Sequence, residues 1–257
     1  MNLSAEQKRV LWQVRFGIPL ADGQFGVALA GNPNVGKSTI FNALTGLHQH
    51  TGNWPGKTVD NAQGSFQYLQ KSFLLVDLPG TYSLLAHTVE EQIARDFLCF
   101  AHPDVTVVVL DATCLERNLN LALQVFEITP KVIVCLNLMD EAQKKSLMID
   151  VPSLERELGV PVVATAARQR EGLTELQEKI LQVASGSLPT SPRQIIYSSE
   201  VEKAVKHLLP MVGSLANNAL SPRWLALRLL DGDRSFLDSL SSYLGVNQCW
   251  EGARCAQ

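Results

Sequence analysis

The order of hydrophobic and polar residues predicts alternating strands and helices from Phe25 onward. Strands are predicted at 25–30, 57–63, 65–69, 72–77, 105–110, 131–137 and 161–165. Helices are predicted at 37–45, 89–101, 116–128, 152–158 and 172–185. Continuous apolar runs such as 105–110 are typical of strands covered on both faces. The pattern therefore predicts an α/β domain with a mostly parallel sheet flanked by helices.

A polar segment at 185–192, with the sequence SGSLPTSP, interrupts this alternation. The strand pattern disappears after it, and further helices are predicted at 198–216, 222–231 and 233–244. Pro222 directly follows Ser221, an order that is common at the start of a helix. The sequence therefore predicts an α/β domain at 25–186 and a small all-α domain at 187–257.

Residues 1–24 form an N-terminal extension with one predicted helix. Its apolar residues recur at helical spacing, and we expect them to pack on the α/β domain rather than to bind a membrane or a partner. They are Leu3, Val10, Leu11 and Val14.

The segment 31–38, GNPNVGKS, fits the phosphate-binding pattern G-x-x-x-x-G-K-[ST]. It lies between a predicted strand and a predicted helix, as the pattern requires, so backbone N–H groups and the helix N-terminus can bind phosphate. We expect Lys37 to reach the β- and γ-phosphates and the Ser38 hydroxyl to bind Mg²⁺. The predicted phosphate contacts are Gly31, Asn32, Pro33, Asn34, Val35, Gly36, Lys37, Ser38 and Thr39.

Asp77 and Gly80 form a D-x-x-G pattern at the end of the strand predicted at 72–77. We expect Asp77 to order the Mg²⁺ shell and the Gly80 N–H to bond the γ-phosphate. Thr58, in the loop GNWPGKT, is the candidate threonine of a first switch loop, whose hydroxyl and carbonyl would reach Mg²⁺ and the γ-phosphate when the loop closes. Thr81 stands where Ras-like enzymes carry a glutamine that orients the attacking water, which predicts slow turnover.

Asn137 and Asp140, in the sequence NLMD after the strand predicted at 131–137, predict selectivity for guanine. A carboxylate accepts hydrogen bonds from guanine N1–H and N2–H₂, whereas adenine would leave it unpaired. Met139 is interpreted as an apolar substitute for a lysine that stacks on the base. Residues 165–167 are interpreted as the last base loop, which consists of Thr165, Ala166 and Ala167, and we expect the Ala166 N–H to approach guanine O6.

Composition narrows the classes of function. The 257 residues carry 22 Lys and Arg against 25 Asp and Glu, which is no basic excess of the kind that nucleic-acid binders show. No apolar run approaches the roughly 20 residues of a membrane helix, and the N-terminus lacks an apolar signal core. The five cysteines contain no C-x-x-C pattern, and we interpret them as reduced thiols of a cytoplasmic protein.

Four segments together resemble the N-terminal cytoplasmic G-protein domain of ferrous iron transport protein B: GNPNVGKST, GNWPGKTV, DLPGTYSL with EEQIARDFL, and NLMD. The segment PRWLALRLLDGD is similar to the helical domain of that family, so the likeness runs from about Gly26 to about Asp233. The resemblance implies a Ras-like P-loop GTPase with a mixed, mostly parallel sheet of six to seven strands, followed by a helical domain.

The resemblance also implies partners and a second metal. Asn34 and the backbone carbonyls around Asn53 and Trp54 match positions that hold K⁺ beside the phosphates, where the cation assists hydrolysis by Lys37, Thr58 and Gly80. In this family the domain precedes a membrane-embedded iron permease, so the expected place is the cytoplasmic face of the inner (cell) membrane. A homo-oligomer stays open, and no nucleic-acid partner is expected.

Two other functions remain open at this point. One is a stand-alone RNA-associated GTPase of the ribosome-assembly or tRNA-modification kind, which also uses N-P-N in its phosphate loop. The other is a scaffold that holds GDP with negligible turnover, an interpretation that Thr81 and the unusual sequence at 165–170 keep open. An ATPase is disfavoured by Asp140.

Overall fold

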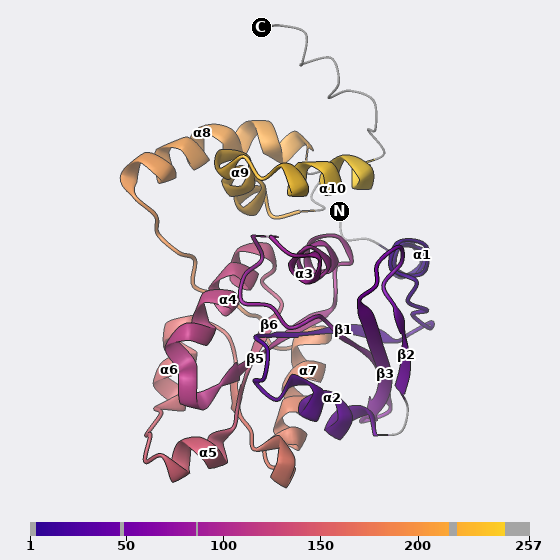
Figure 1. The fold of residues 1–257 in the computed structure, drawn as a ribbon, viewed down its shortest axis with the longest axis vertical. Coiled ribbons are helices and arrows are strands. Elements are labelled where there is room, and N and C mark those ends of the chain that lie inside the picture. Colours follow the sequence, from indigo (N-terminus) through magenta and orange to yellow (C-terminus); the bar gives the residue numbers. More distant parts are fainter. Residues whose placement is uncertain (1–3, 47–48, 86, 216–219, 245–257) are drawn as a thin grey trace, which may run out of the picture. The chain divides into compact units, whose positions relative to one another are not determined.

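The computed structural model describes residues 4–46, 49–85, 87–215 and 220–244 (Figure 1). The chain divides into two compact units, Met1–Ile196 and Tyr197–Gln257. The first unit therefore includes residues 187–196, which the sequence analysis places in the helical domain.

The first unit is built on a seven-stranded sheet with the order β2-β3-β4-β1-β5-β6-β7. Its strands are β1 (Phe25–Gly31), β2 (Gln49–Asn53), β3 (Asp60–Tyr68), β4 (Lys71–Asp77), β5 (Val105–Asp111), β6 (Val132–Asn137) and β7 (Val162–Ala164). The pairs from β4 through β1, β5 and β6 to β7 are parallel, whereas β2–β3 and β3–β4 are antiparallel. This mixed, mostly parallel sheet confirms the predicted fold class.

Helices cover both faces of this sheet (Figure 1). The helices of the first unit are α1 (Ala5–Phe16), α2 (Lys37–Thr45), α3 (Val89–Phe100), α4 (Leu115–Ile128), α5 (Met139–Lys144), α6 (Val151–Leu158) and α7 (Leu173–Ala184). Side chains of α2 and α7 share a buried core with the inner strands, and this core includes Ile40, Phe73, Val107, Ile133 and Leu176. The sheet is thus held rigidly where its strands end in the candidate site.

Three elements differ from the sequence predictions. Residues 60–68 form one strand, where two were predicted at 57–63 and 65–69, since Gly64 stays in register with Leu75. The polar edge strand β2 was not predicted, because the sequence QHTGN has no apolar alternation. Helix α5 was not predicted either, because six residues are too few to show a helical period.

Helix α1 packs through aromatic residues rather than through the predicted aliphatic ones. Val10 and Val14 are exposed, whereas Trp12 and Phe16 are buried. Leu3 lies outside the described residues. The amphipathic face was therefore misassigned, because two large rings outweigh three small aliphatic side chains in buried area.

The second unit contains α8 (Ser199–Leu215), α9 (Pro222–Asp231) and α10 (Arg234–Leu244). Arg223 of α9 donates to both carboxylate oxygens of Glu202 at 2.9 and 2.8 Å, and Trp224 is buried. The exposed apolar residues of this unit include Met211, Leu230 and Leu244.

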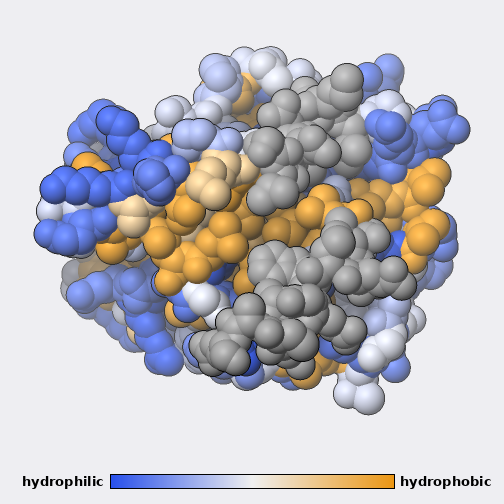
Figure 2. Space-filling view, turned by 90° about the horizontal axis from the view of Figure 1, so that it is seen from above, coloured by the Kyte–Doolittle hydropathy of each residue, from blue (hydrophilic) through white to orange (hydrophobic). Residues whose placement is uncertain are grey.

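Figure 2 shows apolar side chains on the face of the molecule seen from above. No helix in the described part of the chain is long and apolar enough to cross a membrane.

Candidate functional site

The predicted motifs meet at the carboxyl ends of three strands. β1 ends at Gly31, β4 at Asp77 and β6 at Asn137, and these parallel strands end on the same edge of the sheet. Ligands of open α/β sheets bind at this edge. The structure therefore brings the phosphate loop, the D-x-x-G segment and the base segment together.

The phosphate loop depends on two glycines that cannot carry a side chain. A Cβ atom on Gly36, whose φ is +83°, would lie 2.3 Å from Nδ2 of Asn137. A Cβ atom on Gly31 would lie 2.7 Å from the Val109 carbonyl oxygen. The loop backbone can thus approach the sheet edge closely, and its N–H groups at the start of α2 stay available for an anion.

Replacing Gly36 by alanine is expected to cost about 1–3 kcal/mol of folding free energy, from the positive φ and the clash with Asn137. We also expect binding of guanine nucleotide to weaken at least about tenfold, since the loop must move away from the base segment. Thermal unfolding and fluorescent-GDP titration measure the two effects. Gly186→Ala is the matched control, because Gly186 also has a positive φ (+77°) but nothing lies within 4 Å of its Cβ position; equal losses in both variants would contradict the prediction.

Lys37, the first residue of α2, forms an ion pair with the Asp77 carboxylate, and both side chains are largely buried. Burial raises the pKa of Asp77, and the neighbouring Lys37 ammonium partly opposes this rise. In this structure the ammonium therefore compensates a buried carboxylate. A nucleotide that drew Lys37 to its phosphates would leave Asp77 free to face a cation.

The segment after Asp77 is bonded to the phosphate loop. The Thr81 N–H donates to the Gly31 carbonyl at 3.3 Å, and a Cβ on Gly80 would lie 3.2 Å from Cα of Pro33. The Thr81 side chain is buried and its hydroxyl donates to the Ser83 carbonyl at 2.5 Å. Thr81 therefore stabilises the turn at residues 81–83, and its hydroxyl is hydrogen-bonded within the protein.

Two residues of α4 that the sequence analysis did not identify hold this second loop. Oε1 of Gln124 accepts from the Leu84 N–H at 2.7 Å and from the Ser83 hydroxyl at 3.3 Å. The Arg117 guanidinium lies 4.4 Å from the ring centroid of Tyr82. No sequence motif marks either residue, because their partners lie 35 or more positions away along the chain.

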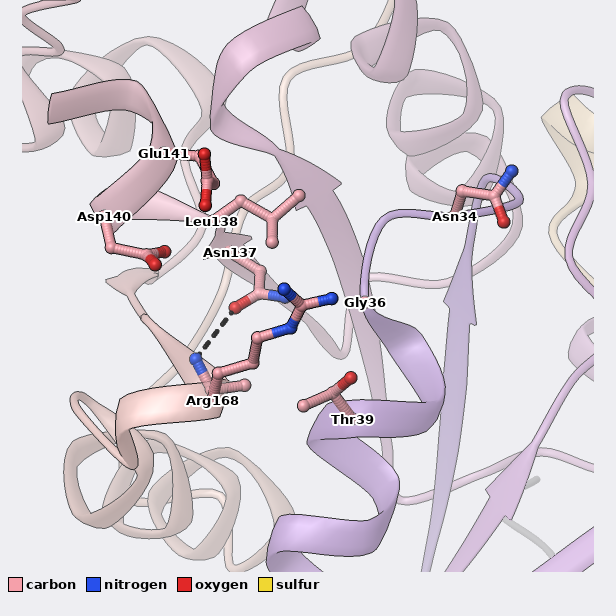
Figure 3. A pocket seen from close by; sticks show the side chains of 9 residues that line it. Asn34, Gly36, Thr39, Asn137, Leu138, Asp140, Glu141 and Arg168 are labelled. Atoms are coloured by element: carbon pink, nitrogen blue, oxygen red, sulfur yellow. Dashed lines mark hydrogen bonds between the residues drawn. The ribbon is translucent and has the colours of Figure 1, made fainter. Parts of the chain in front are cut away.

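A cavity of about 240 Å³ opens beside the phosphate loop (Figure 3). Its lining residues are Asn34, Gly36, Thr39, Asn137, Leu138, Asp140, Glu141, Ala167 and Arg168. Asn137 joins three parts of the site: its Nδ2 donates to the Val35 carbonyl at 3.0 Å, and its Oδ1 accepts from the Thr165 hydroxyl and the Ala167 N–H. The side-chain oxygens of Asp140 lie in the wall of this cavity, as a base-reading carboxylate requires (Figure 3).

The structure adds two details of the base segment. Leu138, not Met139, lines the cavity, because Leu138 adopts a left-handed conformation (φ +63°) that turns the chain before α5. Met139 lines a neighbouring open pocket instead. The Ala166 N–H donates to the Glu171 carbonyl at 3.3 Å and Thr165 is buried, so Ala167 and Arg168 line the cavity in their place.

The first switch loop, residues 54–59, joins β2 to β3. Thr58 and Asn53 are exposed, whereas Trp54 is 3% exposed and packs edge-on against Phe16 and Phe97. The Lys57 N–H donates to the Trp54 carbonyl at 2.9 Å. Trp54 lies in a polar loop of the sequence, yet it is a core residue in this structure.

The histidines are also candidate metal ligands by residue type. Among the residues that the structure describes, no group of three or more His, Cys, Asp and Glu side chains could hold a metal ion. His48 lies outside the described residues. His50 and His87 are exposed.

Comparison with known proteins gives consistent matches. Residues 25–180 match the family described as "Ferrous iron transport protein B", and residues 197–251 match the family described as "FeoB cytosolic helical domain". The Fe(2+) transport protein A/Fe(2+) transporter FeoB fusion protein of Porphyromonas gingivalis is 39% identical over 212 residues, which are 81% of this chain and 25% of the relative. The chain thus spans about a quarter of the length of this curated relative.

Solved structures agree with this match. The cytosolic domain of the T. maritima FeoB iron transporter in its GDP form I is 39% identical, with a TM-score of 0.77 over 88% of this chain and 87% of the other. The same domain in its GMPPNP form is 38% identical, with a TM-score of 0.75 over 90% of both chains.

Proposed function

The chain belongs to the ferrous iron transport protein B family, as its motifs predicted, and from this premise we propose that it is a slowly hydrolysing, GTP-dependent regulatory domain of a ferrous iron transporter. One observation carries the proposal. The phosphate loop, the D-x-x-G segment and a cavity lined by the Asp140 carboxylate lie on one edge of the sheet, and Asn137 bonds the phosphate loop to the segment 165–167. The T. maritima relatives, whose structures are in GDP and GMPPNP forms, support the same class of ligand.

Each residue has a proposed role. The backbone from Gly31 to Thr39 binds the phosphates, Lys37 neutralises the β- and γ-phosphates, and the Gly80 N–H bonds the γ-phosphate. Asp140 reads the guanine edge, with Leu138 packing on the base in place of the lysine stem. The base loop contributes Thr165 and Ala166 through their support of Asn137 and the loop turn, and Ala167 through the cavity wall.

The Ser38 hydroxyl and the Asp77 carboxylate fit Mg²⁺, because both are hard oxygen donors at the mouth of the phosphate loop. Mg²⁺ would neutralise charge on the transferred phosphoryl group. Thr58, whose side chain is exposed in this structure, would join these donors when the first switch loop closes over the nucleotide. Thr81 is engaged in its turn, which supports slow turnover rather than water activation by a side chain.

The proposed K⁺ site has the right donor chemistry and needs the same loop movement. The Asn34 side chain is exposed, and the left-handed backbone at this residue (φ +66°) turns it out of the phosphate loop (Figure 3). The Trp54 carbonyl already accepts the Lys57 N–H, so it is held within the turn. K⁺ would therefore bind when Asn34 and the carbonyls of Asn53 and Trp54 come together.

We expect GTP hydrolysis by this chain to be about fivefold or more faster in KCl than in NaCl at equal ionic strength. Asn34→Ala should lose this stimulation and retain the sodium rate. Asn120→Ala, an exposed asparagine of α4, is the matched control and should respond to K⁺ like the parent chain. Equal rates in both salts would overturn the potassium role, and GDP binding without measurable hydrolysis would favour the scaffold function.

The wider setting is also a proposal. Because the chain spans about a quarter of its curated relative, we propose that it works at the cytoplasmic face of the cell membrane, joined to a permease portion of the same protein. GTP loading would order the two switch loops, and the helical unit would pass the change on to that portion. RNA binding that weakens steeply with salt would instead support the RNA-associated alternative.

A further inference from the structure

Helix α1 lies before residue 25, where the match to the family begins. The family's own motifs therefore give it no role. It is nonetheless a well-formed element: Ser4 and Gln7 form a reciprocal capping box at its start, and Gly17 ends it in a left-handed conformation. The contacts of α1 with the rest of the first unit therefore indicate what this helix does.

Three contacts fix α1 to the α/β domain on its inner side. Nε1 of Trp12 donates to the Ala101 carbonyl at 2.6 Å, and Lys8 pairs with Asp104 at 2.5 Å. A Cβ on Gly26 would lie 2.5 Å from the Trp12 ring, so the glycine makes room for this ring. These contacts place the last turn of α1 at a defined position.

That last turn contacts the first switch loop. The Phe16 ring lies 6.5 Å from the Trp54 ring and 5.0 Å from the Phe97 ring, and Trp54 lies 5.6 Å from Phe97, all edge-on. A Cβ on Gly17 would lie 3.4 Å from Cγ of Pro55. We call Trp12, Phe16, Trp54 and Phe97 the aromatic cluster.

The aromatic cluster also includes a residue of the helix that follows the second switch loop. Phe97 lies on α3, which begins at Val89 directly after the loop that follows Asp77. One buried cluster therefore joins α1, the first switch loop and α3. In this arrangement the Thr58 side chain is exposed and the Trp54 carbonyl accepts from the Lys57 N–H within the loop.

We propose that Phe16 and Trp12 of α1 are positioning residues for GTP hydrolysis: they hold Trp54, and with it the first switch loop, in its open conformation. This inference rests on the proposed function. Closure of the loop over GTP must then pull Trp54 away from Phe16 or move α1 with it. GDP, which has no γ-phosphate to draw Thr58, leaves the cluster intact, so α1 acts as a brake that favours the GDP-like state.

The test uses the full 257-residue chain with Phe16→Ala. We expect its affinity for a non-hydrolysable GTP analogue to rise about five- to tenfold relative to its affinity for GDP, and the hydrolysis rate to rise with it. Val14→Ala, on the same helix but 80% exposed, is the matched control and should keep the parent ratio. Phe16→Leu keeps an apolar side chain without the ring, so it stands in if the alanine variant does not fold, and the same direction of change is expected.

A purely structural role would lower thermal stability and weaken both nucleotides equally. An unchanged ratio of GTP-analogue to GDP affinity in Phe16→Ala and Phe16→Leu would therefore overturn the inference while leaving the proposed function standing. A parent chain that binds neither nucleotide would overturn the proposed function itself. Hydrogen exchange at 54–59 provides a second readout, since faster exchange in the variants is expected only if α1 restrains the loop.

Discussion

Replacing Asp140 by asparagine is expected to lower the affinity for GTP by about a thousandfold or more and to create affinity for xanthosine triphosphate. The Asp140 side chain is 16% exposed and lines the base cavity. Guanine offers two donors, N1–H and N2–H₂, to the two carboxylate oxygens. In Asp140→Asn the side-chain NH₂ group, itself a donor, would face one of these guanine donors and form no hydrogen bond with it. Xanthine carries a carbonyl oxygen in place of the guanine N2–H₂ group, and this oxygen can accept from the asparagine NH₂.

Competition against fluorescent GDP measures this exchange with GTP, ATP and xanthosine triphosphate as competitors. Asp150→Asn is the control with the same chemical change, because Asp150 caps α6 by accepting from the Ser153 N–H and asparagine caps a helix equally well. GTP affinity that is unchanged in Asp140→Asn would remove Asp140 from the base site. ATP competing as well as GTP in the parent chain would contradict guanine selectivity.

The fold was predictable where the sequence carries its own period. The buried strands β1, β4, β5 and β6 show as continuous apolar runs, and each precedes a segment whose chemistry is local in sequence. The phosphate loop needs only its glycines, Lys37 and Ser38 in order. A parallel sheet then brings the strand ends together without further information.

Other features of the site depend on contacts that sequence spacing does not carry. Leu138 and Met139 are neighbours of similar character, and only the left-handed backbone at Leu138 decides which of them faces the cavity. Trp54 gains its core role from Phe16 and Phe97, which approach from α1 and α3. The Ala166 N–H donates to the Glu171 carbonyl, a contact five positions along the chain that no motif marks.

Replacing Lys37 by alanine is expected to reduce GTP hydrolysis by about a hundredfold or more, since the charge facing the transferred phosphate is lost. Lys203→Ala, an exposed lysine of the second unit, is the control and should keep the parent rate. Single-turnover hydrolysis with saturating nucleotide measures the effect. A rate within a factor of about two of the parent would exclude Lys37 from the phosphate site.

The same variant tests the electrostatics of the site. Without Lys37, the pKa of the buried Asp77 carboxyl, which burial already raises, should rise further. When folding raises the pKa of a carboxyl, the folded state binds more protons than the unfolded state above the ordinary carboxyl range, so the stability of Lys37→Ala should fall as the pH rises from that range to the raised pKa of Asp77. Adding Asp77→Asn removes the carboxylate. The double variant should therefore lose this pH dependence and regain thermal stability at pH 7, but it should not regain hydrolysis. This result would separate the contribution of Lys37 to stability from its contribution to phosphate binding and hydrolysis.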